Sequence, residues 1–284
     1  MSANTTRPAE LRTVSFLSSS LRVFDLSLGQ MLWSRRTVFM ALIVGGPVLI
    51  ALIVRALALL GLPAVRIDGT AVGGTAIFGG MIWGLYLRVA VPALAIFYGT
   101  ALMADEIEDK TITYLFARPI PRGAVLIGKY LAYVVCTVMV VLPSVMIVYF
   151  LIVPWGGADL ASTFVDLLKD LAILAVGLAV YGAVFALVGA WFKRPVLIGL
   201  LFAFGWESIV QAVPGYFKKL TILYYLQGLV PHALPQDGLM SVLQNLFRDV
   251  PSLSTCLLVL GLVWAAALTL AARIVGRREY VLEQ

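Results

Sequence analysis

Charged side chains are scarce in this chain. Asp, Glu, Lys and Arg make up 13% of its 284 residues, whereas hydrophobic residues make up 61%. In a soluble globular domain, about a quarter of the residues are charged. Together with a mean hydropathy of +0.98, this scarcity excludes an ordinary soluble domain and predicts an integral membrane protein.

Histidine and cysteine are also scarce. The chain has one histidine, His232, and two cysteines, Cys136 and Cys256, and no metal-binding spacing connects them. The catalytic patterns H-E-x-x-H and G-x-S-x-G are both missing. We therefore expect no enzyme activity, metal or cofactor in this chain, and we expect both cysteines to be apolar packing residues.

Long apolar runs take the place of such groups. A helix needs about 20 apolar residues to cross the hydrocarbon core of a membrane. Six windows of about that length are Val38–Leu60, Met81–Met103, Leu131–Val153, Leu171–Phe192, Val196–Val213 and Leu253–Ala272. Helices are expected because a helix pairs its own backbone amides in lipid, and the alternation typical of barrel strands is absent. The sequence thus predicts an all-α membrane protein with six transmembrane helices.

The basic residues predict its orientation, because Lys and Arg concentrate in cytoplasmic loops. Most of the 21 basic residues flank one set of helix ends: Arg7, Arg12, Arg22, Arg35, Arg36, Lys110, Arg118, Arg122, Lys129, Lys193, Arg194, Arg273, Arg277 and Arg278. Both termini are therefore predicted to be cytoplasmic, in a multi-pass protein of the cytoplasmic (inner) membrane. Contacts with anionic membrane lipids explain the net charge of +6, so no nucleic acid partner is expected.

The windows divide the chain into an arm (1–37), a transmembrane domain (38–275) and a cytoplasmic tail (276–284). In the arm, Leu17, Leu21, Phe24, Leu28 and Met31 recur at helical spacing, which predicts an amphipathic helix along the inner membrane surface. The alternative is the cytoplasmic start of a long first helix. The longest outward segment is 214–252, and its sequence after Asp237 predicts a capped amphipathic helix. Pro92 and Pro143 are expected to kink their helices.

The stretch Gly123–Tyr130 has the spacing G-x-x-x-x-G-K of a phosphate-binding loop. It carries Tyr130, however, where such a loop needs Ser or Thr to hold Mg²⁺. It also leads directly into a predicted membrane helix, with no predicted strand before it. We therefore expect no ATP binding by this chain, and we expect Gly128 and Lys129 to lie close to the lipid headgroups.

Three charged residues fall inside the apolar windows. Arg55 lies near the outer end of the first window, where its side chain can reach the headgroups. Arg88 and Glu207, in the second and fifth windows, are each predicted about 10 Å below the outer boundary, at about 1.5 Å of rise per residue. Gln211 lies one turn after Glu207 and extends a polar stripe. Either both charges reach the outer headgroups, or they line a substrate path, as an ion pair if they meet.

A compact polar segment, residues 105–122, separates the second and third windows. It begins with acidic residues, and Ile107, Thr111, Tyr114 and Leu115 would share one face of a helix. Pro119 ends such a helix, because proline disfavours helical geometry at the residue before it. We predict a short cytoplasmic helix at about 105–117 that docks into a groove of another protein. An ordinary solvated loop is the alternative.

This segment resembles a known family. The order Glu106-x4-Thr111-x3-Leu115-x2-Arg118-Pro119-x-Pro121-Arg122, followed by Gly128-Lys129-Tyr130, is similar to the cytoplasmic connection between the second and third spans of ABC-2 type exporter permeases. The whole plan of six spans, cytoplasmic termini and a longer fifth-to-sixth connection is also similar. The resemblance implies an ABC-2 transmembrane domain with a coupling helix at about 105–117. It further implies docking on a separate ATPase through Glu106, Ile107, Thr111, Tyr114, Leu115, Arg118 and Arg122.

The resemblance also implies a dimer of membrane subunits, formed by two identical or two related chains. Two copies of an ABC ATPase would bind ATP and Mg²⁺, and the second and fifth helices, which carry Arg88 and Glu207, would flank the central path. We therefore predict a permease subunit that exports a substrate by alternating access. Two alternatives are a secondary carrier that uses Arg88 and Glu207 for ion coupling, and an ATPase-coupled membrane scaffold or mechanotransmitter that transports nothing.

Overall fold

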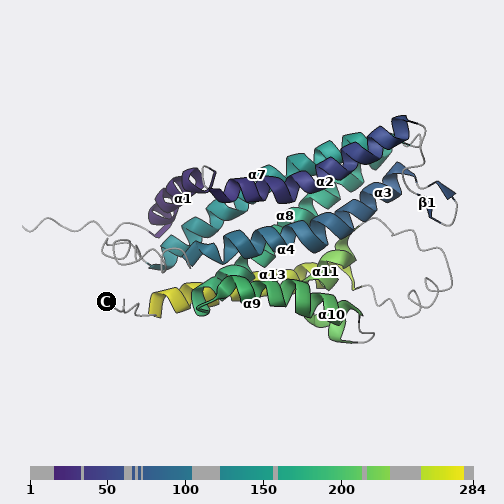
Figure 1. Cartoon of the computed structure of the whole chain (residues 1–284). Coiled ribbons are helices and arrows are strands. Elements are labelled where there is room, and N and C mark those ends of the chain that lie inside the picture. The colour runs from purple at the N-terminus through teal and green to yellow at the C-terminus, as the bar shows by residue number, and fades with distance from the viewer. Residues whose placement is uncertain are drawn as a thin grey trace, which may run out of the picture.

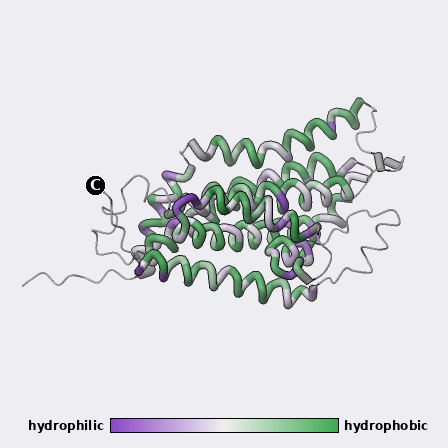
Figure 2. The backbone as a smooth tube through the Cα atoms, turned by 60° about the horizontal axis from the view of Figure 1, so that its bottom comes forward, coloured by the Kyte–Doolittle hydropathy of each residue, from purple (hydrophilic) through white to green (hydrophobic). Residues whose placement is uncertain are grey.

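The architecture is taken from a computed structural model of the chain. It describes residues 16–32, 35–60, 66–67, 70–71, 73–103, 122–155, 159–212, 216–230 and 251–277. Long helices run roughly side by side between two ends of the molecule (Figure 1). Hydrophobic residues follow the helices along their length, and most hydrophilic residues lie near the helix ends (Figure 2). This distribution is that of a helical bundle surrounded by lipid.

Within the described residues, six helices make up the bundle, as the sequence predicts. Five are long and apolar enough to cross a membrane, and the apolar helix Pro195–Gln211 is a shorter sixth. They consist of α2 (Arg35–Leu59); α3 (Gly74–Met81), η1 (Ile82–Ala90), α4 (Val91–Leu94) and η2 (Ala95–Gly99); α7 (Arg122–Ile152); α8 (Leu160–Trp191); α9 (Pro195–Leu200), η3 (Leu201–Trp206) and α10 (Glu207–Ala212); and α13 (Leu253–Arg277).

Several helices begin earlier than the apolar windows. The second, third and fourth spanning helices start at Gly74, Arg122 and Leu160, whereas their windows start at Met81, Leu131 and Leu171. A window of about 20 residues matches the hydrocarbon thickness only, and a helix continues into the polar headgroup region. Residues that the windows place outside the membrane helices therefore belong to them, and Asp170 is one such residue.

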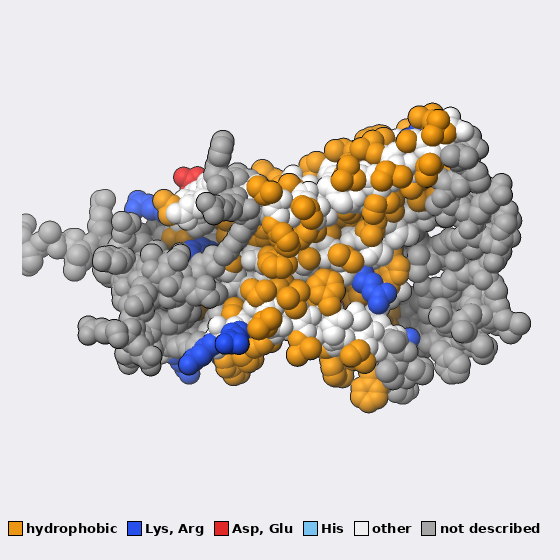
Figure 3. Space-filling view, in the orientation of Figure 1, with side chains coloured by type: hydrophobic (Ala, Val, Ile, Leu, Met, Phe, Trp, Pro, Cys, Tyr) orange, Lys and Arg blue, Asp and Glu red, His pale blue; other side chains and the backbone are white. Residues whose placement is uncertain are grey.

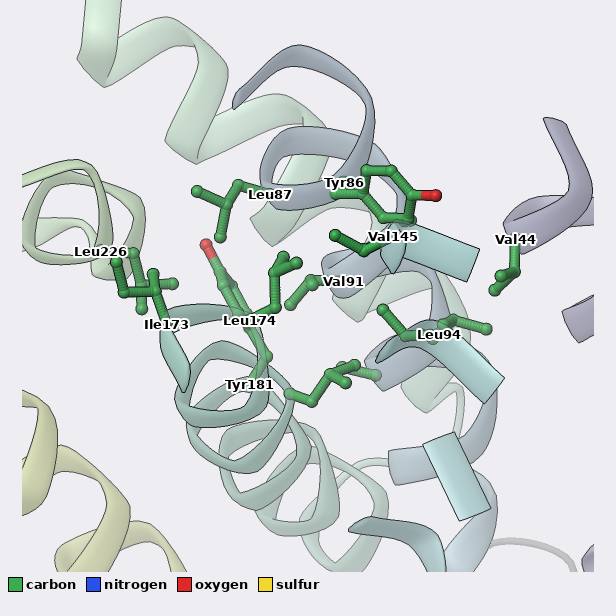
Figure 4. Close-up of a cluster of buried hydrophobic side chains, with 14 of the residues drawn as sticks. Val44, Tyr86, Leu87, Val91, Leu94, Val145, Ile173, Leu174, Tyr181 and Leu226 are labelled. Carbon is green, nitrogen blue, oxygen red and sulfur yellow. The ribbon is translucent and has the colours of Figure 1, made fainter. Parts of the chain in front are cut away.

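The second helix is central to the bundle. In its most apolar stretch 61% of the residues are buried inside the protein, compared with 22% in α2 and in α13. The close-up shows Leu87, Val91 and Leu94 of this helix packed with Leu174 and Tyr181 of α8 (Figure 4). Because α2 and α13 leave many large hydrophobic side chains exposed, lipid or a partner subunit has to cover them.

Two glycines of α8 allow the second, third and fourth helices to approach closely. A Cβ atom at Gly182 would overlap the ring of Tyr133, and one at Gly189 would overlap the backbone of Thr100. Small residues at helix contacts are the usual solution for close packing in membranes, where no hydrophobic effect drives helices together. These three helices therefore form a tightly packed unit.

The amphipathic helix predicted in the N-terminal arm corresponds to α1 (Phe16–Leu32), which packs mainly against α7. It turns its small polar residues inward: Ser19, Ser20 and Ser27 are buried, whereas Leu21 is 61% exposed. A Cβ atom at Gly128 would lie 2.5 Å from the backbone oxygen of Ser20, so glycine is needed there. The exposed apolar side chains are left for lipid, as expected of a helix at the membrane surface.

Proline acts differently in different helices. Pro92 lies between two π-helical segments, η1 and η2, so the predicted disturbance of the second helix is present. Pro143 lies inside α7, which continues through it from Arg122 to Ile152, and Pro47 lies inside α2. The second helix is thus the one in which proline coincides with a change of helix type.

The remaining described elements lie at the ends of the bundle. Strands β1 (Arg66–Ile67) and β2 (Thr70–Ala71) pair antiparallel, with Arg66 opposite Ala71. The 3₁₀-helix η4 (Tyr216–Leu220) and α11 (Ile222–Leu229) follow the fifth helix. The hairpin, α10 and α11 lie at the end opposite to α1 and to the end of α13 (Figure 1). By the predicted orientation, this is the outer end.

Candidate transport site within the membrane

The carboxylate of Glu207 is buried between three elements. Glu207 is 1% exposed and is the first residue of α10, directly after η3. The hydroxyl of Tyr181, on α8, donates a hydrogen bond to Oε2 of Glu207. The backbone N–H of Ile222, the first residue of α11, donates to Oε1 at 3.1 Å. Glu207 therefore joins the fifth helix to the fourth helix and to α11.

Glu207 also caps α11. The first N–H groups of a helix have no partner within the helix, and a nearby anion stabilises them. Thr221 occupies the N-cap position of α11, but its side chain makes no capping hydrogen bond. Glu207, 15 residues earlier in the chain, supplies an acceptor from another helix. The position of α11 at the outer end thus depends on a residue within the membrane.

Arg88 lies near the middle of the described part of the second helix. It lies in η1, 14 residues after the first residue of that helix, Gly74, and 15 residues before Met103. Its predicted depth, about 10 Å below the outer boundary, stays a prediction. Its side chain is exposed. Arg88 thus lies near the middle of the most buried spanning helix, but its side chain faces away from the protein interior.

Within one chain, the structure does not join Arg88 to Glu207. Both oxygens of the Glu207 carboxylate accept bonds from Tyr181 and Ile222. Over the described ranges, the ion pair found joins Lys169 and Asp166 at 2.8 Å, near the outer end of α8. Within a single chain, the tyrosine hydroxyl and a helix N-terminus satisfy the carboxylate, and a pair between Arg88 and Glu207 across the central path stays a prediction.

The two charges nevertheless lie at a similar level of the bundle. Leu87, which precedes Arg88, lies beside the hydroxyl end of Tyr181 (Figure 4). That hydroxyl binds Glu207. Gln211, one turn after Glu207, has its Nε2 atom buried with no hydrogen-bond partner among the described residues. The amide group of Gln211 is therefore not fully satisfied within the described chain, and the polar stripe on the fifth helix stays a prediction.

Both charges lie on helices that depart from regular α-helical geometry. The π-helical segments of the described chain are η1 and η2 in the second helix and η3 in the fifth. Arg88 lies within η1, and Glu207 directly follows η3. Short π-helical segments are rare and are frequently found at functional sites. The two helices expected to flank a path are thus the two with this irregularity.

Sequence reasoning missed two polar residues of this region. Tyr181 lies among small and aliphatic residues of α8, and a hydroxyl in such a run was a signal that it has a buried partner. Asp170 is fully buried in α8, but the fourth window began one residue after it. Both residues lie on the helix that packs closely against the second helix.

Most residues predicted to contact an ATPase lie outside the described residues. They are Glu106, Ile107, Thr111, Tyr114, Leu115 and Arg118, and the coupling helix at 105–117 stays a prediction. Arg122 is the first residue of α7. The first turns of α7 pack against α1, where Gly128 meets Ser20 and Val23. The amphipathic helix predicted after Asp237 also lies outside the described part of the chain.

Comparison with protein families gives one assignment. The model of a family described as "ABC-2 family transporter protein" matches residues 25–276, which include the spanning helices described above except the last residue of α13. A search of curated proteins gives no match to this chain.

Proposed function

The chain belongs to the ABC-2 transporter family and is a multi-pass membrane subunit of an ABC transporter, and we propose that it is the permease of an ATP-driven exporter. In this proposal, two permease subunits, identical or related, surround a central path in the cytoplasmic membrane. Two copies of a separate ATPase bind ATP and Mg²⁺ on the cytoplasmic side. This chain moves the substrate and does not hydrolyse ATP.

The observation that carries this proposal is the connection from Glu207 to α11. Alternating access requires the two ends of a path to open in turn, so a movement of the spanning helices has to reach the outer end. Glu207 lies at the end of a π-helical segment of the fifth helix and holds the first backbone N–H of α11. A change of the fifth helix at η3 would therefore move or release α11.

The cytoplasmic half of the mechanism rests on the segment before α7. ATP binding would close the two ATPases together and push on the helix predicted at 105–117. Because α7 begins at Arg122, the push would be transmitted along α7 and to α1, which packs on its first turns. Glu106, Ile107, Thr111, Tyr114, Leu115, Arg118 and Arg122 would make the contact with the ATPase.

One observation favours a different transport class. A buried carboxylate such as that of Glu207 is the type of group that ion-coupled carriers use to bind a proton or cation. In a secondary carrier, transport would follow an ion gradient and continue without ATP. In the scaffold alternative, the ATPase would be coupled to the membrane subunit and no substrate would cross.

Purification of the native complex is the decisive experiment. The affinity-tagged chain is isolated from its own membrane, and the co-purifying proteins and lipophilic molecules are identified by mass spectrometry. The complex is then reconstituted into vesicles, with a matched complex whose ATPase lacks the lysine of its phosphate-binding loop. We expect an ABC ATPase in the complex and ATP-dependent movement of a co-purified molecule. Movement that survives the ATPase variant and stops on dissipation of the ion gradient would support the secondary carrier instead.

A further inference from the structure

Arg88 is unusual among the charged residues of this protein. Across the described spanning helices, it is the one exposed charged side chain in the central third of a helix. On the face shown in Figure 3, most of the visible basic side chains lie near the end of the bundle that carries α1, while hydrophobic side chains cover most of the middle. A cation at this depth in lipid is strongly unfavourable unless it meets an opposite charge or water.

Arg88 lies far from both described ends of the second helix. The 14 residues that separate it from Gly74 correspond to about 20 Å along a helix, at about 1.5 Å per residue. An arginine at such a position is stabilised by water or by an opposite charge. An anionic ligand that approaches the exposed guanidinium would supply such a charge.

The acidic residues of the described chain do not supply this charge. Glu207 and Asp170 are buried inside the protein, and Tyr181 and Ile222 bind both oxygens of Glu207. The more accessible acids, Asp25, Asp159 and Asp166, lie in α1 or near the outer end of α8, far from mid-membrane. The described acids of one chain thus leave Arg88 open to an anionic ligand.

The surface beside Arg88 has room for an apolar group. Gly80 and Gly84 precede Arg88 at intervals of four residues, about one turn apart, and a Cβ atom at either glycine would meet nothing within 4 Å. The neighbouring Val89 is 45% exposed. This part of the second helix therefore offers a single cation beside open, apolar backbone.

We propose that Arg88 binds the negatively charged headgroup of an amphipathic substrate, whose apolar part lies along Gly80 and Gly84. The inference rests on the proposed export function, and it adds the class of substrate: an anion with a hydrocarbon or other apolar tail. Arginine is suited to this role because its planar guanidinium keeps its charge and binds phosphate or carboxylate through two parallel hydrogen bonds. Gly80 and Gly84 leave space for the tail beside the guanidinium.

Binding can be measured without knowledge of the natural substrate. The purified complex is placed in nanodiscs of phosphatidylcholine, and radiolabelled dodecyl phosphate is used as the probe. Dodecanol together with inorganic phosphate tests whether head and tail have to be joined. Arg88→Gln removes the charge, and Arg88→Lys keeps it. Arg55→Gln is the matched control, because Arg55 is an arginine near the outer end of α2. Thermal unfolding of each variant checks that it is folded.

We expect saturable binding of dodecyl phosphate, with an affinity at least tenfold lower in Arg88→Gln, a loss of about 1.4 kcal/mol. The affinity should be largely kept in Arg88→Lys and unchanged in Arg55→Gln. Dodecanol with phosphate should not compete. Equal affinity in Arg88→Gln and the natural chain would overturn the inference, as would equal competition by inorganic phosphate alone.

A second measurement separates this inference from the proposed export function. Stimulation of ATP hydrolysis by dodecyl phosphate is compared in the natural complex and in Arg88→Gln. Binding that depends on Arg88, in a complex without an ATPase, would overturn the exporter and leave the anion site in place. ATP-driven transport of the co-purified substrate at an unchanged rate in Arg88→Gln would leave the exporter in place and overturn the anion site. A third variant, Gly84→Leu, should exclude the probe while Arg88 is kept.

Discussion

The hydroxyl of Tyr181 donates a hydrogen bond to the carboxylate of Glu207 across the fourth and fifth helices. Within one chain, this contact and the N–H of Ile222 bind the Glu207 carboxylate, whereas the sequence left an ion pair with Arg88 open as one alternative. This arrangement has a clear physical advantage, since a neutral donor and a backbone N–H can satisfy a buried carboxylate without placing a second charge in the membrane interior. The energetic coupling of this region should therefore be between Tyr181 and Glu207.

A double-mutant cycle tests this coupling. Tyr181→Phe leaves the buried carboxylate with one donor fewer and should destabilise the protein by about 1–3 kcal/mol. In combination with Glu207→Gln, the two effects should be non-additive by at least about 0.5 kcal/mol, because the residues are in contact. Arg88→Met with Glu207→Gln should be additive. Thermal unfolding of the purified protein in detergent gives all of these values.

The control for this cycle is Tyr225→Phe. Its hydroxyl donates to the backbone oxygen of Lys219 at 2.9 Å in an exposed position, so its removal should have little effect. Additive effects of Tyr181→Phe and Glu207→Gln would show that the hydrogen bond contributes nothing to the fold.

Gly182→Ala should destabilise the bundle, by about 1–3 kcal/mol as is typical of overpacked cores. The added Cβ atom would overlap the ring of Tyr133, whose hydroxyl donates to the backbone oxygen of Leu178 at 3.0 Å. Gly261→Ala, on α13, is the matched control, since nothing lies within 4 Å of the added atom. The unfolding temperature of both variants checks the prediction, and equal temperatures would contradict the close packing of α7 and α8.

Ile112→Pro should disconnect the ATPase from the membrane subunit. A proline in the middle of a helix costs about 3 kcal/mol, so the helix predicted at 105–117 should not form. We expect the variant to keep its membrane fold, to lose its ATPase on purification and to lose transport. Ile112→Ala is the control, because alanine favours a helix. Full transport by Ile112→Pro would rule out a coupling helix in this segment.

Cysteine labelling tests the orientation. In a chain with Cys136 and Cys256 replaced by Ala, cysteines at Ser2 and Gln284 should react with a membrane-impermeant maleimide only after the cytoplasmic side is opened. A cysteine at Gly238 should react from outside in intact cells. External labelling of both termini would invert the orientation and place the segment 105–122 on the wrong side for a cytoplasmic ATPase.

The number and order of the spanning helices could be predicted because they follow from local hydropathy. Arg88 and Glu207 could be chosen as candidate site residues for the same reason, since a charge in an apolar run is visible in the sequence. The residues that bind them could not be predicted. Glu207 is bound by Tyr181 and by the N–H of Ile222, and these contacts depend on how helices pack and on where α11 folds back. The π-helical geometry of η1 and η3 also gives no hydropathy signal.

The start of the second helix could not be predicted. Its apolar window begins at Met81, whereas the helix begins at Gly74. Composition does not indicate that the second helix starts at Gly74. The N–H of Gly74 donates to the backbone oxygen of Trp155 at 2.9 Å, so a contact just after the third helix fixes where the second helix starts.

The packing of α1 has a consequence for the synthesis of this protein. A chain emerges from the ribosome with its N-terminus first, so α1 is made about a hundred residues before α7, on which it packs. During that interval its serine face has no partner. Its exposed leucines allow it to bind the lipid surface during that interval. It can pack on α7 only when the third span has entered the membrane. A chain that is truncated before α7 should therefore keep α1 on the membrane surface, unpacked and open to proteases.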